Sequence, residues 1–520
     1  MKHTIIFIVI LSAIVLYFDY SSMYEQLPVS THQWRQSDGT SMALNYYQNG
    51  MNFWKPQHHN MFGVEGYSVG EFPGLYYITA CLYHVFGVEE GLFRLVNFLL
   101  FSLGLLALSK LILKITDDDL LSFAIPALLM ASPLIGFYAF NFLPDTSALG
   151  FVFIAWYFFY SFYKSRIIKW LYLSSFFFLL GGLFKVTALL TLVPIMAAYF
   201  LELIGVFKFK GKERLFSGSW LKRISAGLPF ILAIAGTAAW YLFAIQYNET
   251  NHTTYFRTYI GAIWTMDQQS ILYTFKRIFI FWGLDYFHWS VHILTALLLG
   301  WITFTPKRHD PFLYFFTVLS GIGVLLFVLM FLAAFDLHDY YMINLLVLPV
   351  LVLAMGGAFL RKKHPSILNR WKFKFAVVAF VLFNFYHAKQ TITSRYAEGS
   401  VHRTGFSPVF YDHENIRAFL KENGVEYPEK VLSMPDRSPN STLYYMNLRG
   451  WTELYNYPFD AEKIKLFATF GAKYLIVSDT AYLSKPELQL AFIKPIANYK
   501  RQLFLFDIQD LENKKLIIED

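Results

Sequence analysis

THQWRQSDGTSMALNYYQNGMNFWKPQHHNMFGVEGYSVGEFP, residues 31–73, is a polar, aromatic stretch in a chain that is otherwise mostly apolar. It follows the first hydrophobic run directly and holds side chains that can give or take a proton: His32, Arg35, Asp38, Lys55, His58, His59 and Glu71. Long polar loops that break an apolar pattern usually carry function. We expect this loop to roof a reaction chamber at a membrane surface, with Asp38 as the reacting carboxylate.

The composition is that of a membrane protein. The 520 residues are 56% hydrophobic and 15% charged, whereas soluble domains carry about 25% charged residues. Residues 92–113 and similar runs are long enough, as helices, to cross roughly 30 Å of hydrocarbon. The sequence therefore predicts an α-helical polytopic membrane protein.

The charge pattern argues against a nucleic-acid partner. The net charge is +8, but the basic residues cluster in short loops between apolar runs, as the positive-inside rule describes. The single cysteine, Cys81, excludes an intrachain disulfide and a cysteine-based metal site. Residues 1–18 look like a signal peptide but lack a small-residue cleavage site, so we expect a retained first span.

Eleven hydrophobic runs predict about eleven spans with the N-terminus inside: residues 4–18, 92–113, 120–140, 147–163, 171–184, 188–204, 224–247, 289–304, 312–335, 342–360 and 373–386. The run at 72–87 is ambiguous. All the basic loops fall on the cytoplasmic side only if this run lies along the membrane interface as an amphipathic helix. The turns that carry candidate chemistry then share the opposite, extracytoplasmic face of an inner (plasma) membrane.

The composition changes after about residue 390. Short strand-like runs at 431–434, 474–478 and 503–507 follow or alternate with the helical patterns HENIRAFLKENG and DAEKIKLFATFGA. Such alternation is typical of a small α/β domain. We predict a transmembrane domain at 1–390, whose first extracytoplasmic loop is 19–90, and an extracytoplasmic α/β domain at 391–520.

The candidate carboxylates also admit structural roles. Asp38 can be a helix N-cap, because Asp is favoured there and Gly-Thr-Ser-Met-Ala-Leu can start a helix. Asp145 can cap the helix that follows Pro144, or be a second carboxylate over the same chamber. Glu71 lies at a bend, where a glutamate is often simply solvated. The triplet Asn440-Ser-Thr fits a glycosylation acceptor, but such triplets are common by chance.

Lys185 stands between two apolar runs, where a charge is costly and usually functional. A lysine at a helix end can also extend its amine to the membrane surface. Residues 336–341 place His338 and Tyr341 in one turn with two further acids. Tyr340 and Tyr341 can belong to an interfacial aromatic belt. A single histidine without a second one at ligand spacing is not typical of a metal site. We assign no metal ligand.

The motifs, taken in order, resemble the polytopic GT-C glycosyltransferases of the family 39 type, which include protein O-mannosyltransferases and bacterial aminoarabinose transferases. The residues that carry the resemblance are Asp38-Gly-Thr-Ser-Met-Ala, Glu71-Phe-Pro-Gly-Leu-Tyr-Tyr, Arg94-Leu95, Pro144-Asp145, Gly-Leu-Phe-Lys185 and His338-Asp-Tyr-Tyr with Pro349. The resemblance implies a GT-C-like fold with juxtamembrane helices in the first loop.

It also implies an activity. A sugar would pass, with inversion, from a polyprenyl-phosphate-linked donor to a hydroxyl of a lipid, glycan or protein acceptor in the cell envelope. Asp38 would be the general base. Asp145 and Glu71 would position the acceptor or orient cations. The donor phosphate would be bound by Lys185, Arg35, Tyr341, His338 and Lys55. No cofactor is predicted with certainty, and a divalent cation remains open.

Two positions depart from the family pattern. A lysine commonly follows the acid of the acid-Lys-Pro-Pro turn, where this chain has Phe72. An arginine commonly follows the first aspartate by about three residues, where this chain has Ser41, and Arg35 precedes Asp38 instead. We therefore expect Lys185, Lys55 or Arg35 to supply the missing phosphate contact.

Two other classes of function compete. A transporter or lipid flippase would place ionisable residues within its spans and show related halves, whereas here the charges lie at helix ends and no repeat is seen. A scaffold that binds a partner through 391–520 leaves Asp38, Asp145 and Lys185 on one face without an explanation.

Overall fold

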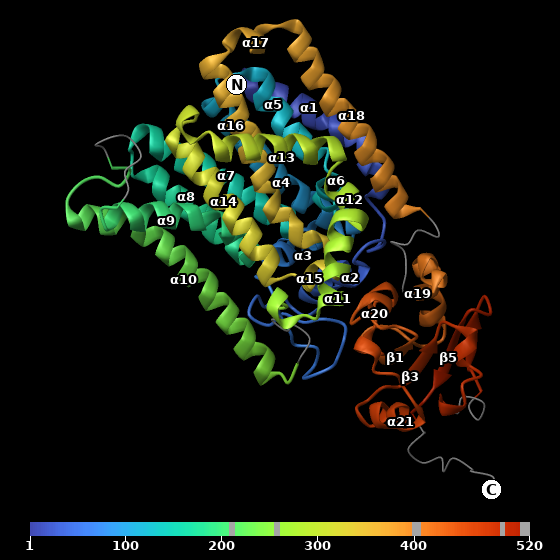
Figure 1. Ribbon diagram of the computed structural model, residues 1–520. Coiled ribbons are helices and arrows are strands. Elements are labelled where there is room, and N and C mark those ends of the chain that lie inside the picture. The colour runs from blue at the N-terminus through green and yellow to red at the C-terminus, as the bar shows by residue number, and fades with distance from the viewer. Residues whose placement is uncertain (207–213, 254–259, 398–406, 489–493, 510–520) are drawn as a thin grey trace. The chain divides into compact units, whose positions relative to one another are not determined.

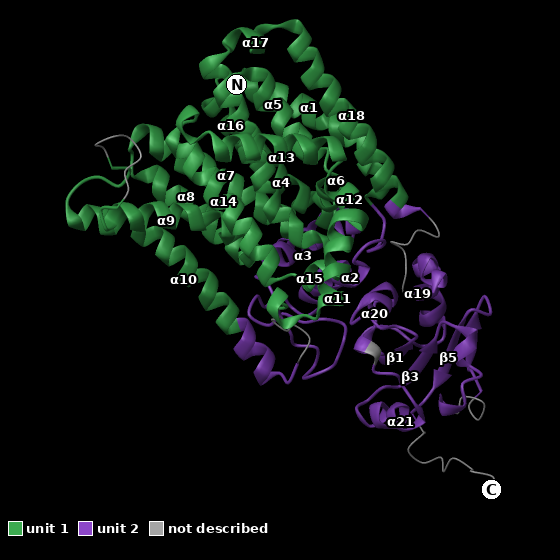
Figure 2. Ribbon diagram, viewed as in Figure 1, with its two compact units in different colours: residues 1–24, 93–243, 258–394 green, residues 25–92, 244–257, 395–520 purple. Residues whose placement is uncertain are grey.

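The computed structural model describes residues 1–206, 214–253, 260–397, 407–488 and 494–509. It is mainly helical, with one small sheet near the C-terminus (Figure 1). The chain forms two compact units (Figure 2): unit 1 is residues 1–24, 93–243 and 258–394, and unit 2 is residues 25–92, 244–257 and 395–520. The polar loop that follows the first helix thus belongs to the same unit as the C-terminal residues, while the predicted domain boundary at 390 stays a prediction.

Unit 1 is built from helices. In chain order they are α1 (Lys2–Phe18), α4 (Glu90–Thr116, which begins in unit 2), α5 (Asp119–Met130), α6 (Pro133–Ala139), α7 (Asp145–Ser165), α8 (Lys169–Phe184), α9 (Val193–Leu203), α10 (Trp220–Thr250), α11 (Gln268–Lys276), α12 (Gly283–Tyr286), α13 (Trp289–Phe304), α14 (Pro311–Met330), α15 (Ala334–Leu337), α16 (Val347–Lys363), α17 (Pro365–Asn369) and α18 (Trp371–Tyr396).

Among the described residues, six helices are long and apolar enough to cross a membrane, or seven if the bent pair α5 and α6 is one span. The pair bends by 79°, because Ser132 and Pro133 end one helix and cap the next. The apolar helices α1, α8 and α13 are shorter, and predicted run 373–386 lies within α18. The predicted multi-pass membrane protein is confirmed, and six or seven of the eleven predicted runs meet the length and composition of a span.

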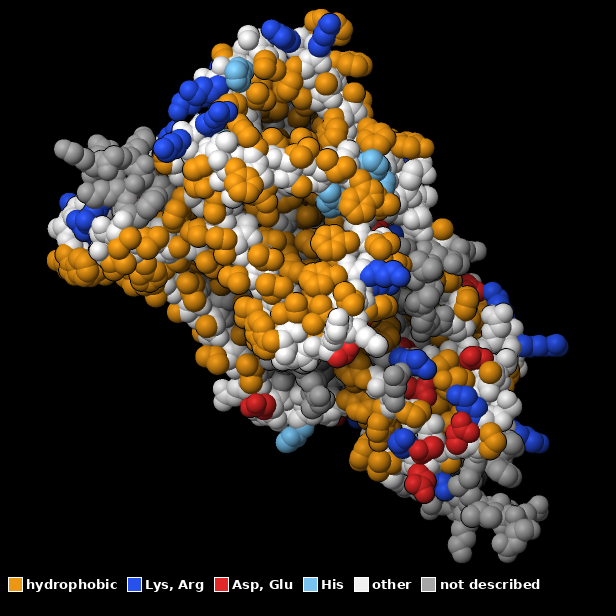
Figure 3. Space-filling model, in the orientation of Figure 1, with side chains coloured by type: hydrophobic (Ala, Val, Ile, Leu, Met, Phe, Trp, Pro, Cys, Tyr) orange, Lys and Arg blue, Asp and Glu red, His pale blue; other side chains and the backbone are white. Residues whose placement is uncertain are grey.

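Basic residues and candidate site residues lie at opposite ends of the same helices. α7 starts at Asp145 and ends beside Lys164 and Arg166. α16 follows the turn that holds Tyr341 and ends in Arg361–Lys363. Figure 3 shows Lys and Arg side chains near α16 and α17, while apolar side chains cover the flank of the helices. This separation within unit 1 is what the loop-charge pattern predicted.

The start of α7 is fixed by contacts with α4. Gly104 and Gly150 bring the two helices so close that a Cβ on Gly104 would lie 2.2 Å from Cα of Gly150, the kind of small-residue contact common between membrane helices. Asn97 on α4 donates from Nδ2 to the carbonyl oxygens of Tyr138 and Asn141, both at 3.1 Å. These bonds hold the turn that leads into Asp145.

Unit 2 combines helices with a five-stranded sheet. Its helices are α2 (Gln33–Gln48), α3 (Gly74–Phe86), α19 (His413–Glu422), α20 (Ser441–Met446) and α21 (Ala461–Thr469). Its strands are β1 (Lys430–Met434), β2 (Arg449–Thr452), β3 (Tyr474–Val477), β4 (Ala497–Tyr499) and β5 (Leu503–Asp507), in the order β2-β1-β3-β5-β4. β1 is parallel to β2 and β3, and β5 is antiparallel to β3 and β4. The predicted α/β region is confirmed, and β1, β3 and β5 lie at the three predicted strand-like runs.

Both faces of this sheet are covered. Val431 and Ile476 pack with residues of α19 and α20 on one face, and Leu432 and Leu475 pack with residues of α21 on the other. Because side chains alternate along a strand, such strands read as continuous apolar runs. The α3 helix, which contains most of the ambiguous run 72–87, has 13 residues and is not among the helices long enough to span.

The first loop adds a short extension to the sheet edge. Asn60 forms a parallel bridge with Gly450 of β2: the Gly450 amide donates to the carbonyl of His59 at 3.0 Å, and the Met61 amide donates to the carbonyl of Gly450 at 2.7 Å. A Cβ at Gly450 would lie 1.8 Å from the carbonyl oxygen of Val431. Only glycine fits there.

Gly450→Ala is therefore expected to destabilise unit 2. The clash is with backbone, which cannot turn aside, so we expect a loss of roughly 3 kcal/mol, seen as a lower midpoint in thermal unfolding of the detergent-solubilised protein. Gly424→Ala is the control, because Gly424 also has a positive φ (77°) but an added Cβ meets nothing within 4 Å. Equal midpoints for the two variants would contradict the close approach.

Candidate functional site

The helix α2 presents two of the candidate side chains, Arg35 and Asp38, on one face. It begins at Gln33, after His32 in a left-handed conformation with φ of 56°, and Asp38 lies in its second turn. The N-cap alternative for Asp38 is therefore wrong. Residues three apart are neighbours on a helix, so Arg35, Asp38 and Ser41 share a face. Asp38 is only 5% exposed.

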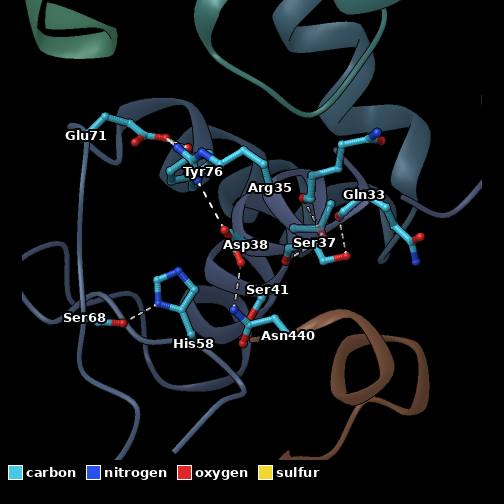
Figure 4. A network of polar contacts seen from close by, with 12 residues as sticks. Gln33, Arg35, Ser37, Asp38, Ser41, His58, Ser68, Glu71, Tyr76 and Asn440 are labelled. Atoms are coloured by element: carbon cyan, nitrogen blue, oxygen red, sulfur yellow. Dashed lines mark hydrogen bonds and ion pairs between the residues drawn. The ribbon is translucent and has the colours of Figure 1, made fainter. Parts of the chain in front are cut away.

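Asp38 has a hydrogen-bond donor and an ion-pair partner (Figure 4). The Nδ2 of Asn440 donates to its Oδ1 at 3.0 Å, and the Nη1 of Arg35 lies 3.7 Å from its Oδ2. The guanidinium of Arg35 also pairs with Glu71, which accepts a hydrogen bond from the hydroxyl of Tyr76. The structure thus joins Asp38, Arg35 and Glu71, three of the predicted residues, into one network.

Asn440 is a residue that the sequence analysis did not connect with the site. Its Oδ1 accepts from the backbone amide of Asn60 at 2.9 Å and from the hydroxyl of Ser41 at 3.4 Å. These two donors fix the amide so that its Nδ2 points to Asp38. Asn440 is fully buried, so its glycosylation-like triplet is not an accessible acceptor in this fold. Asn440 lies 402 positions from Asp38 in the sequence, so no motif spacing connects the two residues.

The adjacent histidines of the first loop are buried beside this network. His58 Nδ1 lies 2.8 Å from Ser68 Oγ, and His59 Nδ1 lies 2.7 Å from Ser41 Oγ. Burial lowers the pKa of each to about 3, because desolvation disfavours the charged ring. Both rings are therefore neutral near pH 7 and act through hydrogen bonds rather than charge.

A second group of predicted residues comes together in unit 1. The N-cap of α7 is Pro144 and Asp145 is its first residue, so the capping alternative for Asp145 is wrong. Its carboxylate, 1% exposed, lies 3.0 Å from Nζ of Lys185. Lys185 has an extended backbone between α8 and the 3₁₀ segment Val186–Leu192. The break in the helix places the amine at a helix end beside Asp145.

Aromatic rings surround this ion pair. Nζ of Lys185 lies 4.9 Å from the ring centre of Tyr340 and 5.4 Å from that of Tyr341, within cation–π range. The ring of His338 stacks on Tyr341 at 5.7 Å. The structure therefore brings Lys185, Asp145, Tyr341 and His338 into one group, with Tyr340 as a member that the predictions had not singled out.

Lys55 and Phe72 are placed differently. Lys55 is exposed on the turn after α2, and no contact described for the chain joins its side chain to either group. Phe72 packs against Phe53, with ring centres 5.3 Å apart, so an aromatic contact stands where the family pattern has a lysine. Of the cations considered for phosphate binding, Lys185 and Arg35 belong to buried polar groups.

The described residues contain no group of three or more His, Cys, Asp or Glu side chains arranged to hold a metal ion.

Comparisons with known proteins give one family match and several structural matches. Residues 71–212 match the family described as dolichyl-phosphate-mannose-protein mannosyltransferase. No curated protein matches the chain by sequence. The matched segment holds Glu71, Asp145 and Lys185.

Three solved structures share the fold over nearly the whole chain. ArnT from Cupriavidus metallidurans in the apo state is 11% identical, with a TM-score of 0.58, and the match covers 98% of both chains. ArnT from the same organism bound to undecaprenyl phosphate is 12% identical, with a TM-score of 0.55 and coverage of 96% and 97%. Arabinofuranosyltransferase AftD from Mycobacteria is 11% identical, with a TM-score of 0.56, and the match covers 96% of this chain and 41% of AftD.

At these identities the structures establish the fold. The enzyme class predicted from the sequence, a glycosyltransferase, is that of the family model and of these structures. The chain has the fold of the GT-C glycosyltransferases, and the resemblance predicted from its motifs is confirmed.

Proposed function

We propose that the chain transfers a sugar from a polyprenyl-phosphate-linked donor to an acceptor hydroxyl, with inversion, at the extracytoplasmic face of the inner membrane. The observation that carries the proposal is the buried carboxylate of Asp38, held between Arg35 and Asn440. A buried carboxylate that accepts a hydrogen bond on one oxygen and faces a cation at the other is oriented for proton transfer. The undecaprenyl phosphate in the ArnT structure supports the donor class.

In the proposed step, Asp38 accepts the proton of the acceptor hydroxyl as the hydroxyl oxygen forms a bond to the anomeric carbon. The bond from that carbon to the phosphate oxygen breaks, and the electron pair leaves with the polyprenyl phosphate. The leaving group is an anion and needs positive charge rather than a proton. Lys185 supplies that charge in the proposal, with Tyr341 and His338 lining its surroundings and Asp145 holding its amine.

Arg35 and Glu71 take a positioning role. Because Arg35 is already paired with Glu71 and lies near Asp38, it orients the Asp38 carboxylate in the proposal. Lys55, exposed on its turn, is the least supported of the phosphate-binding candidates, and the proposal does not depend on it. The acceptor is a lipid, glycan or protein hydroxyl.

The purified protein in nanodiscs is tested with a panel of undecaprenyl-phosphate-linked hexoses and pentoses. Release of undecaprenyl phosphate that depends on an envelope-lipid or envelope-glycan extract supports the proposal, and mass spectrometry of the extract identifies the product. Uptake of a solute by sealed vesicles, with no released undecaprenyl phosphate, would instead identify a transporter.

Asn440→Ala is expected to lower the transfer rate about tenfold or more, because a hydrogen bond to a charged group contributes about 1.5–3 kcal/mol. Asn440→Asp is expected to move the rising limb of the pH–rate profile to higher pH, because a second carboxylate beside Asp38 disfavours its ionised form. Asn498→Ala, at the exposed central position of β4, is the control. A pH profile that stays in place in Asn440→Asp would mean that Asn440 does not act on the base.

A further inference from the structure

A cavity of about 380 Å³ opens in the C-terminal part of unit 2, apart from the Asp38 network. It is lined by three acids, two cations and two aromatic rings: Glu453, Asp460, Glu487, Arg437, Lys485, Phe459 and Tyr482. The volume is within the range of small-molecule sites, about 300–1,000 Å³. None of these residues takes part in the proposed transfer.

The cavity lies where open α/β sheets bind ligands. Arg437 follows β1, Glu453 follows β2, and Tyr482 follows β3, so the loops after three parallel strands contribute to it. β1 lies between β2 and β3 in the sheet. The chain leaves β1 toward β2 on one side and later returns to β3 on the other, which makes the carboxyl ends of β1 and β3 a topological switch point. Ligands characteristically bind outside the strands at such a point.

Glu453 forms the buried acceptor of the cavity. Its side chain is 4% exposed, and it accepts a hydrogen bond from the Phe459 amide at 3.3 Å. Burial raises the pKa of Glu453, and the Phe459 amide and the charges of Lys485 and Arg437 oppose that rise. Two cations of the lining therefore act electrostatically on one buried carboxyl.

Two aromatic rings and one acid that already has partners also line the cavity. Nζ of Lys485 lies 3.3 Å from the ring centre of Tyr482, and Phe459 adds buried apolar surface. Asp460 already caps α21, accepting from the Lys463 amide at 2.8 Å, and pairs with Lys463 Nζ at 3.0 Å. The side chains of the cavity that can bind a ligand therefore include both acids and cations.

This chemistry selects a class of ligand. A phosphate or nucleotide site gathers cations, and a metal site gathers acids. Interspersed carboxylates, a guanidinium, an amine and ring surfaces instead suit many neutral hydroxyl groups on an apolar ring frame. We propose that this cavity binds a short stretch of uncharged carbohydrate. The inference goes beyond the proposed transfer, because it concerns binding and does not depend on Asp38.

The test measures retention of full-length protein, in nanodiscs, on an array of neutral and anionic oligosaccharides. We expect retention on at least one neutral oligosaccharide, lowered at least tenfold in Arg437→Ala and Glu453→Gln and unchanged in Arg501→Ala, on an exposed turn between β4 and β5. Arg437 is exposed, so its variant keeps the fold, which a thermal unfolding midpoint verifies.

Asp38→Asn is expected to bind the array as the unsubstituted protein does, so loss of transfer and loss of carbohydrate binding are separable. The proposal is overturned if no neutral oligosaccharide is retained, if Arg437→Ala binds as well as Arg501→Ala does, or if inorganic phosphate displaces the bound oligosaccharide.

Discussion

Asp38→Asn is expected to lower transfer by roughly 10³-fold while the protein stays folded in the membrane, because a positioned general base contributes about 10²–10⁴-fold. Asparagine keeps the size and shape of aspartate, and Arg35 remains paired with Glu71. The variant therefore removes proton acceptance and leaves most of the network in place. Release of polyprenyl phosphate from a labelled donor measures the effect.

Two further variants test whether the loss of transfer comes from the missing carboxylate of Asp38. Asp38→Glu keeps a carboxylate on a longer side chain and should retain more activity than Asp38→Asn. Asp267→Asn removes one exposed acid that caps α11 and should leave transfer unchanged. Normal turnover by Asp38→Asn, with an unaltered unfolding midpoint, would exclude Asp38 as the base and with it the proposed mechanism.

The second large effect is expected from Lys185→Met. This change leaves the carboxylate of Asp145, 1% exposed, without its counter-charge. Breaking a buried ion pair from one side costs about 3–5 kcal/mol, so we expect a much lower unfolding midpoint. We also expect loss of transfer, because the leaving phosphate loses its cation.

The double variant Asp145→Asn with Lys185→Met separates these two effects. It removes both charges, so the unfolding midpoint should return toward that of the unsubstituted protein. Transfer should remain lost if Lys185 binds the donor phosphate. Recovery of transfer together with stability would show that the pair is purely structural, and the phosphate site would then have to be sought elsewhere.

Much of the membrane fold follows from local sequence signals. Apolar runs with basic loops predict helices with one basic end, and α7 and α16 follow that rule. Strands β1, β3 and β5 are mostly apolar and were predicted, whereas β2, with the sequence RGWT, and the three-residue β4 carry no such pattern. Ser132 and Pro133 cause the bend between α5 and α6. The hydropathy of residues 120–140, a mostly apolar run, does not predict it.

The candidate site was only partly predictable. Arg35 and Asp38 are three residues apart, so their shared face follows from the helix that contains them, and Lys185 stands out as a charge between apolar runs. Asn440 could not be found in this way, because its role depends on a contact with a distant segment and on two donors that orient its amide. The N-cap interpretation of Asp38 failed because the helix begins five residues earlier, at Gln33, and its N-cap is the left-handed His32.

The hydrogen bond between Asn440 and Asp38 joins residues that are 402 positions apart. At a synthesis rate of about 5–20 residues per second, roughly 20–80 s pass between the emergence of Asp38 and that of Asn440. Throughout that interval the nascent chain carries a first loop whose carboxylate has not met its amide partner. Assembly of the Asp38 network therefore awaits the last part of the chain, and a prematurely terminated product would reach the membrane without it.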